Sequence, residues 1–61
     1  MPSLTAKELT ALDDQLNMEK ILVKKYETYS ANCTDPMIQS KFRQIAETHR
    51  THYNKLMTFL G

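Results

Sequence analysis

Several features that commonly stabilise or punctuate a small protein are scarce in this chain. It contains one cysteine, so no internal disulfide can form, and its only glycine is the last of its 61 residues. Its two prolines are Pro2 and Pro36. Because glycine and proline most often interrupt helices, the sequence predicts long helices with a single break. A chain this short forms one small domain that buries little surface, so association or a bound metal is expected to add stability.

The chain also lacks an excess of either charge and any long apolar run. Eight Lys and Arg oppose seven Asp and Glu, which gives a net charge of +1 without a block of like charge. This balance argues against nucleic-acid binding, including binding through a helix-turn-helix. No apolar run approaches the about 18 residues of a membrane span, and the first residues lack the apolar core of a secretory signal. We therefore expect a soluble protein made in the cytoplasm, with neither nucleic acid nor membrane as a partner.

A first helix is predicted over about residues 6–31. Thr5 and Glu8 have the spacing of a capping box, in which each side chain accepts a hydrogen bond from the other residue's backbone N–H. Beyond them, apolar residues recur at three- and four-residue steps, as on one face of a helix. Glu19 takes one position of this stripe. The apolar members are Leu9, Leu12, Leu16, Val23 and Tyr26, and Leu22 and Tyr29 widen the stripe on one side.

A turn at 32–35 separates this helix from a second one, predicted over about residues 36–60. Either Thr34 or Asp35 can cap the second helix, and Pro36 suits its first turn, where no backbone N–H is required. The second stripe again alternates between four- and three-residue steps. Its positions are taken by Ile38, Phe42, Ile45, His49, His52, Leu56 and Phe59, so that two histidines stand where apolar residues are expected.

So short a turn predicts an all-α fold in which the helices form an antiparallel hairpin. Two helices cannot cover stripes this wide, whereas two hairpins packed face to face close a four-helix bundle. A two-fold homodimer is the common way to achieve this. The facing pairs expected within each hairpin are Leu9–Phe59, Leu12–Leu56, Leu16–His52, Glu19–His49, Val23–Ile45, Tyr26–Phe42 and Ser30–Ile38.

The polar layer formed by Glu19, His49 and His52 has two interpretations. Imidazole and carboxylate are ligands for divalent metals such as Zn, Fe or Mn, and His49 and His52 at i and i+3 share one helix face. The three residues are therefore candidate metal ligands, with two copies of each in a homodimer. Alternatively, the layer is structural: Glu19 accepts hydrogen bonds from the histidines and the layer fixes the register of the helices. Both interpretations remain open from the sequence.

Other residues give less specific signals. Cys33 is expected to fill space near the turn, and Glu47 is expected to be a solvated surface acid rather than a ligand. Met18 and Ile21 lie off the stripes, where they are either simply exposed or part of a second contact surface. The chain offers no nucleophile–base pair, no glycine-rich phosphate loop and no CxxC motif. It is therefore expected not to be an enzyme.

The segments LTAKELTALDDQLNMEKILVKKYETYS and DPMIQSKFRQIAETHRTHYNKLMTFL, which cover nearly the whole chain, carry a family resemblance. They resemble the small spore-coat-like proteins of endospore-forming bacteria that are related to spore coat protein F. The most specific part runs from Asp35–Pro36 through Phe42, Ile45–Ala46 and His49 to His52–Tyr53 and Leu56. The resemblance implies a ferritin-like fold, a non-enzymatic structural role in the sporulating cell, a place in the spore coat, and other coat proteins as partners.

Ferritin-like di-iron proteins place a Glu on the first helix of each hairpin and Glu-x-x-His on the second. By this resemblance, Glu19 matches the first position and His52 matches the histidine, whereas His49 stands where the second glutamate belongs. With His-x-x-His in that position, di-iron chemistry is not expected. What the resemblance leaves is a histidine-rich mononuclear site or a layer kept for packing. Our first hypothesis is thus a homodimeric structural or interaction protein, and the alternative is a metal-binding protein.

Overall fold

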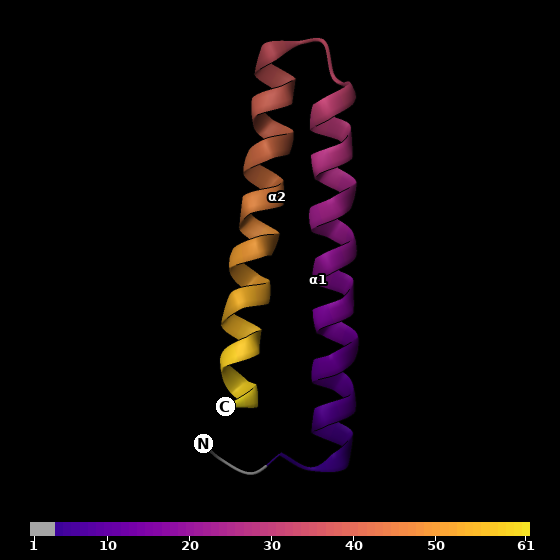
Figure 1. Ribbon diagram of the computed structural model, residues 1–61, viewed down its shortest axis with the longest axis vertical. Coiled ribbons are helices and arrows are strands. Elements are labelled where there is room, and N and C mark those ends of the chain that lie inside the picture. The colour runs from indigo at the N-terminus through magenta and orange to yellow at the C-terminus, as the bar shows by residue number, and fades with distance from the viewer. Residues whose placement is uncertain (1–3) are drawn as a thin grey trace.

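The computed structural model describes residues 4–61, which form an antiparallel pair of helices. Helix α1 spans Ala6–Asn32, helix α2 spans Pro36–Met57, and a short 3₁₀ helix, η1, spans Thr58–Leu60. The two long helices lie side by side, joined by the turn at one end, with the start of α1 and the end of η1 at the other (Figure 1). The predicted all-α hairpin is confirmed. None of the helices in the described part of the chain has the length and apolar character needed to cross a membrane.

Helix α1 begins with the predicted capping box. The backbone N–H of Thr5 donates to Glu8 Oε1 at 2.9 Å, and the backbone N–H of Glu8 donates to Thr5 Oγ1 at 3.1 Å. Both bonds use N–H groups that the first turn leaves without a helical acceptor. The hydrogen bonds with the backbone and the hydroxyl of Thr5 hold the pKa of the Glu8 carboxyl below its usual range. The start of α1 is therefore fixed by local side-chain chemistry.

Asp35, rather than Thr34, caps helix α2. Its Oδ1 accepts hydrogen bonds from the backbone N–H groups of Met37 at 2.9 Å and Ile38 at 3.1 Å. Pro36 follows in the first turn, where its missing N–H removes no hydrogen bond. A carboxylate at this position also interacts favourably with the helix dipole.

We expect Asp35→Ala to lower the free energy of unfolding by about 1 kcal/mol, because two backbone donors lose their acceptor. Asp35→Asn is the matched control, since its side-chain oxygen retains the capping geometry and should leave stability close to that of the wild type. Urea unfolding followed by circular dichroism measures both variants. Equal stability of the alanine and asparagine variants would show that the cap contributes nothing.

The register of the hairpin is fixed near the turn by a reciprocal pair of polar contacts. The buried Ser30 donates from Oγ to the carbonyl of Gln39 at 3.2 Å, and Gln39 Nε2 donates to the carbonyl of Ser30 at 3.0 Å. The expected pairing of Ser30 with Ile38 was therefore wrong by one position, because Gln39 is the residue that faces α1. The expected Tyr26–Phe42 pair is confirmed, with ring centroids 6.0 Å apart.

The apolar stripe of α2 lies beside the contact with α1 rather than within it. Ala46, which is not part of the stripe, is the most buried residue of α2, with 2% of its surface exposed. On an α-helix, the residues at positions i−1, i+3 and i−4 lie together on one side of residue i. Relative to Ala46, these are the stripe residues Ile45, His49 and Phe42, all of which are only half-buried. Of the apolar residues in 4–61, only Leu16 and Ala46 are buried.

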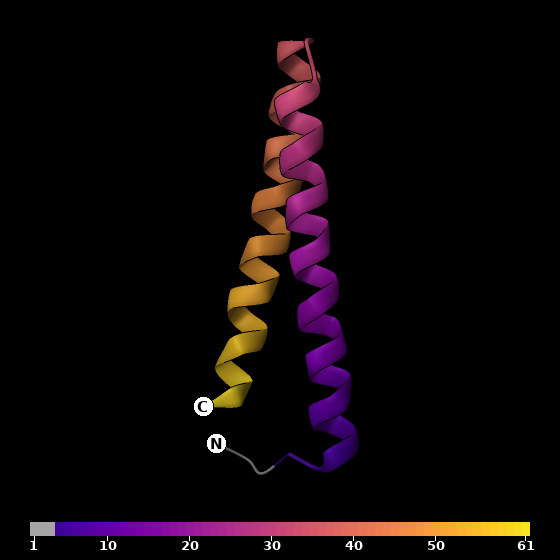
Figure 2. The same cartoon turned by 45° about the vertical axis from the view of Figure 1, so that its right-hand side comes forward.

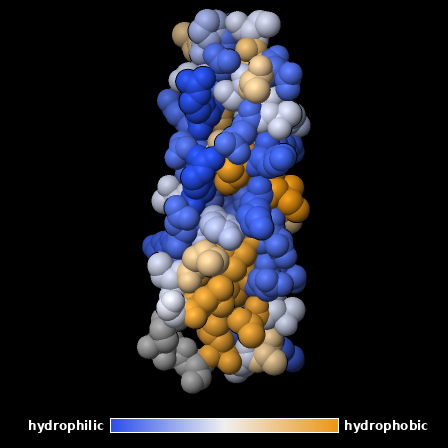
Figure 3. All heavy atoms as spheres, viewed as in Figure 1, coloured by the Kyte–Doolittle hydropathy of each residue, from blue (hydrophilic) through white to orange (hydrophobic). Residues whose placement is uncertain are grey.

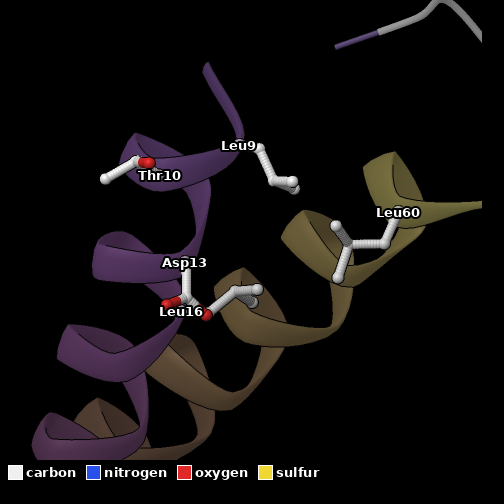
Figure 4. Close-up of a pocket in the computed structure, with 5 residues that line it drawn as sticks. All are labelled: Leu9, Thr10, Asp13, Leu16 and Leu60. Carbon is white, nitrogen blue, oxygen red and sulfur yellow. The ribbon is translucent and has the colours of Figure 1, made fainter. Parts of the chain in front are cut away.

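The hairpin opens toward the end that holds the chain termini. Both ribbon views show α1 and α2 closer together near the turn than at the opposite end (Figure 2). On the face seen in Figure 3, apolar side chains gather over both helices at this open end, whereas most of the remaining face is hydrophilic. Leu9 of α1 and Leu60 of η1 point toward each other across a hollow there (Figure 4). The lining of that hollow is Leu9, Thr10, Asp13, Leu16 and Leu60.

Candidate metal centre

Glu19, His49 and His52 meet where the sequence placed them on facing helices. Glu19 Oε2 lies 2.8 Å from His49 Nδ1, and Glu19 Oε1 lies 3.5 Å from His52 Nδ1. The carboxylate is buried, with 5% of the residue exposed, whereas 52% of the His52 side chain is exposed. Each carboxylate oxygen therefore faces one imidazole, and the group is open to solvent on the side of His52.

Two neighbouring side chains orient the cluster. Gln15, one turn before Glu19, donates from Nε2 to Glu19 Oε1 at 3.2 Å. The Tyr26 ring stacks on His49 with a centroid distance of 6.1 Å and an interplanar angle of 14°. His49 and His52 meet edge to face, with centroids 5.6 Å apart. Both the carboxylate and the His49 ring are thus held by groups outside the cluster.

The environment of Glu19 favours its ionised form. Burial by itself would raise the pKa of the carboxyl, because it disfavours the charged form. Hydrogen bonds from His49 and Gln15, together with the positive charge that the imidazoles can carry, outweigh burial and hold the pKa of Glu19 below its usual range. The result is a buried carboxylate that is charged near neutral pH and paired on both oxygens.

The lowered pKa of Glu19 predicts an acid-sensitive contribution to stability. In the unfolded chain, a glutamate carboxyl titrates near pH 4.3. The contribution of Glu19 to stability is therefore fully present above about pH 4.3, and it is lost as the pH falls through the lower pKa that Glu19 has in the folded protein. We therefore expect wild type to lose more stability than Glu19→Gln between about pH 6 and about pH 3. Urea unfolding at the two pH values measures both losses. Identical losses would contradict this account of Glu19.

The three side chains have the composition and the proximity of a metal-binding group. One ligand atom from each of Glu19, His49 and His52 can be chosen so that all three lie within 4.8 Å of one another. Imidazole nitrogen and carboxylate oxygen together suit zinc and other borderline divalent ions of the first transition row. The structure thus brings together all three predicted ligand candidates on one hairpin.

The structure also adds residues that the stripe pattern did not single out. Gln15 lies four residues before Glu19, and this i, i+4 spacing on a helix was the available signal for its contact with the carboxylate.

Arg50 joins the two helices by an ion pair with Glu27 at 2.9 Å and also pairs with Glu47 on its own helix. Glu47 is therefore an exposed surface acid, as expected, and takes no part in the cluster.

The two flanks of the hairpin differ in chemistry. On one flank, rings follow one another from Tyr29 to Phe42 at 5.5 Å, Phe42 to Tyr26 at 6.0 Å, Tyr26 to His49 and His49 to His52. We call this the aromatic flank, and it includes the outward-facing stripe of α2. The opposite flank carries the Arg50–Glu27 pair, and hollows along it are lined by Lys20, Lys24, Glu27, Arg43, Arg50 and Asn54 among others.

The fold and the cluster together define an all-α helical hairpin that carries a Glu–His group, in which Glu19 is buried and His52 is exposed. No protein-family model, curated protein or solved structure matches the chain.

Proposed function

We propose that the chain is a non-enzymatic structural or interaction protein that acts as a homodimer, in which two hairpins pack through their aromatic flanks into a four-helix bundle. The observation that carries the proposal is the position of the α2 stripe beside the helix–helix contact. Ile38 and Phe59 of this stripe are exposed, and Phe42 and Ile45 are only half-buried. A second hairpin would remove these side chains from water.

The energetic argument favours the aromatic flank as the contact between copies. Burying a large apolar side chain contributes about 1.5–3 kcal/mol, so the several stripe residues would offset the loss of freedom on association. The opposite flank is lined by charged side chains of both signs, among them Lys20, Lys24, Glu27, Arg43 and Arg50. Removing these charges from water would cost free energy, which disfavours that flank as the contact between copies.

The resemblance to small spore-coat-like proteins supports a setting for this module. A homodimeric bundle with no catalytic group would serve as a building unit of the spore coat, with other coat proteins as further partners. Ferritin-like proteins build their bundles from helical hairpins, which agrees with the architecture proposed here. The proposed location is accordingly the spore coat.

A second candidate function is metal binding, because Glu19, His49 and His52 place ligand atoms within 4.8 Å of one another. The ions that suit this set are Zn²⁺, Fe²⁺ and Mn²⁺, with zinc favoured over manganese by the two imidazoles. A bound ion would also supply the extra stability that a 61-residue chain needs. This function is compatible with the homodimer and is tested separately below.

A pair of charge substitutions tests the homodimer. Ile45→Glu places a carboxylate in the aromatic flank and is expected to abolish the dimer, and most of the folded state with it. Ile21→Glu is the matched control, because Ile21 is 62% exposed and lies off the stripe. Thermal melts over a hundredfold range of protein concentration should show a concentration-dependent midpoint for wild type and Ile21→Glu. A wild-type midpoint independent of concentration would contradict the proposal.

A further inference from the structure

We propose that the outer face of helix α1 is a second contact surface, and that its partner is the same face of another copy of the chain, packed in the antiparallel direction. The face is formed by Asp14, Met18, Ile21 and Lys25, and we call it the outer seam. It lies beside the aromatic flank and shares no residue with it. The inference goes beyond the proposed homodimer and does not depend on it.

The spacing of the four residues puts them on the side of α1 that faces away from α2. They follow one another at steps of four, three and four residues, the spacing of a single helix face, and all four are exposed. Met18 comes two residues after the buried Leu16, and Ile21 comes two residues after the buried Glu19. Because a step of two residues turns an α-helix by about 200°, the outer seam points away from the contact with α2.

The middle of the outer seam is apolar. Met18 is 51% exposed and Ile21 is 62% exposed. A hollow beside Ile21 is lined by Lys20, Ile21, Lys24 and Lys25. The methylene stems of lysines give such a hollow apolar walls, and the flexible, unbranched side chain of methionine fills irregular spaces. Met18 of a second copy would therefore suit this hollow.

The order of the residues makes the outer seam complementary to itself. Asp14 lies four residues before Met18, and Lys25 lies four residues after Ile21. A two-fold axis midway between Met18 and Ile21 brings Met18 level with Ile21 of the second copy. The same axis brings Asp14 level with Lys25 of the second copy. Because the symmetry repeats each contact, two apolar layers are flanked by two ion pairs.

Both charged groups can take part in such a contact. Within residues 4–61, the ion pairs are made by Glu19, Glu27, Glu47 and their partners, and neither Asp14 nor Lys25 is among them. Lys25 Nζ lies 5.8 Å from the ring centroids of Tyr26 and Tyr29, at the outer limit of a cation–π contact. Its flexible stem allows the ammonium to turn toward a carboxylate across the seam.

Charge selects the antiparallel direction over the parallel one. In a parallel pair in register, Asp14 would face Asp14 and Lys25 would face Lys25, and like charges across an interface disfavour that arrangement. The antiparallel pair replaces both repulsions by attractions. Beyond the charged levels, the same axis brings together the small side chains of Ala11 and Thr28, so the two helices can remain in contact there.

The contact is expected to be weak. Each copy buries only two large apolar side chains in it, and exposed ion pairs add little. An interface below about 1,200 Å² is typical of transient contacts, so we expect association in the range of about 0.1–1 mM. The proposed homodimer would thus be unaffected at micromolar concentration. Because a homodimer carries two outer seams, assembly at higher concentration would extend beyond four chains.

Sedimentation equilibrium of the full chain without metal, from about 10 µM to about 2 mM, tests the inference. We expect the mean mass of wild type to rise at the upper end of this range. Asp14→Lys should weaken this second association at least about tenfold, because two ion pairs become two repulsions. The double variant Asp14→Lys/Lys25→Asp should restore it, because the partners of each ion pair are exchanged. Circular dichroism verifies that each variant is folded.

Two further variants serve as controls. Asp13→Lys makes the same change of charge one residue away, off the outer seam, and should assemble like wild type. Ile21→Glu should keep the mass seen at low concentration and lose the rise at high concentration.

The outcomes for the outer seam and for the homodimer are distinguishable. A mass that does not rise with concentration, a rise that Asp14→Lys leaves unchanged, or a double variant that does not recover would overturn the antiparallel contact. A mass of one chain at low concentration would reject the homodimer through the aromatic flank. In that case, a rise that is lost in Asp14→Lys and recovered in the double variant would still support the outer seam.

Discussion

Replacement of Phe42 by alanine is expected to lower the free energy of unfolding by about 3–5 kcal/mol and to shift the protein from dimer to monomer. Phe42 contacts Tyr26 and Tyr29 within the hairpin, with ring centroids 6.0 and 5.5 Å apart. In a single hairpin the Phe42 ring is only half-buried. The loss of unfolding free energy therefore reaches this size only if a second copy covers the ring. Circular dichroism melts and sedimentation at matched concentration measure both effects.

Two control variants calibrate this result. Leu16→Ala removes a side chain that is 7% exposed within one hairpin, so it should cost about 2–5 kcal/mol in a monomer or a dimer. Ile21→Ala alters a side chain that is 62% exposed and should change stability by less than about 0.5 kcal/mol. A Phe42→Ala variant as stable as Ile21→Ala would mean that the aromatic flank remains in water.

The second large effect is the response of the protein to zinc. Free zinc at about 100 times its dissociation constant should stabilise the wild type by about 2.7 kcal/mol, which raises the melting midpoint on the order of 10 °C. The double variant His49→Leu/His52→Leu should show no such response. Without metal, the same variant should be less stable than wild type by about 3–5 kcal/mol, because it leaves the buried Glu19 carboxylate without its imidazole partners. Only when Glu19 is replaced by leucine as well should apolar side chains substitute for the layer without loss.

Acidity provides an internal check on the zinc response. Imidazole must be neutral to coordinate a metal, and free imidazole titrates near pH 6.5. The zinc-induced shift should therefore be large at about pH 7.5 and small at about pH 5.5. A shift of equal size at both pH values, or one that persists in the double leucine variant, would place the zinc elsewhere on the chain.

The starts of the two helices were predictable because their determinants are local. The Thr5–Glu8 capping box and the Asp35–Pro36 start of α2 are short motifs whose hydrogen bonds form within one turn. The near-absence of glycine and internal proline then leaves few other places for a helix to end. The pairing of Glu19 with His49 followed from the short turn, which fixes which residues face each other.

The apolar stripes in the sequence do not predict how each helix is rotated about its own axis. Periodicity defines the apolar side of α2 but does not show whether that side faces α1 or lies beside it. The small side chain of Ala46 lets α2 approach α1 there, and this turns Ile45 and His52 outward. The same rotation explains why Gln39, not Ile38, meets Ser30. Contacts of long polar side chains, such as Gln15 with Glu19, depend on this rotation as well.

The molar mass of the wild-type protein at sedimentation equilibrium decides the claim that the hairpin is half of a four-helix bundle. At micromolar concentration, without metal, we predict a mass of twice the 7.1 kDa of one chain, together with the helical circular dichroism of the folded protein. A folded, helical species of 7.1 kDa across the whole concentration range would contradict the claim.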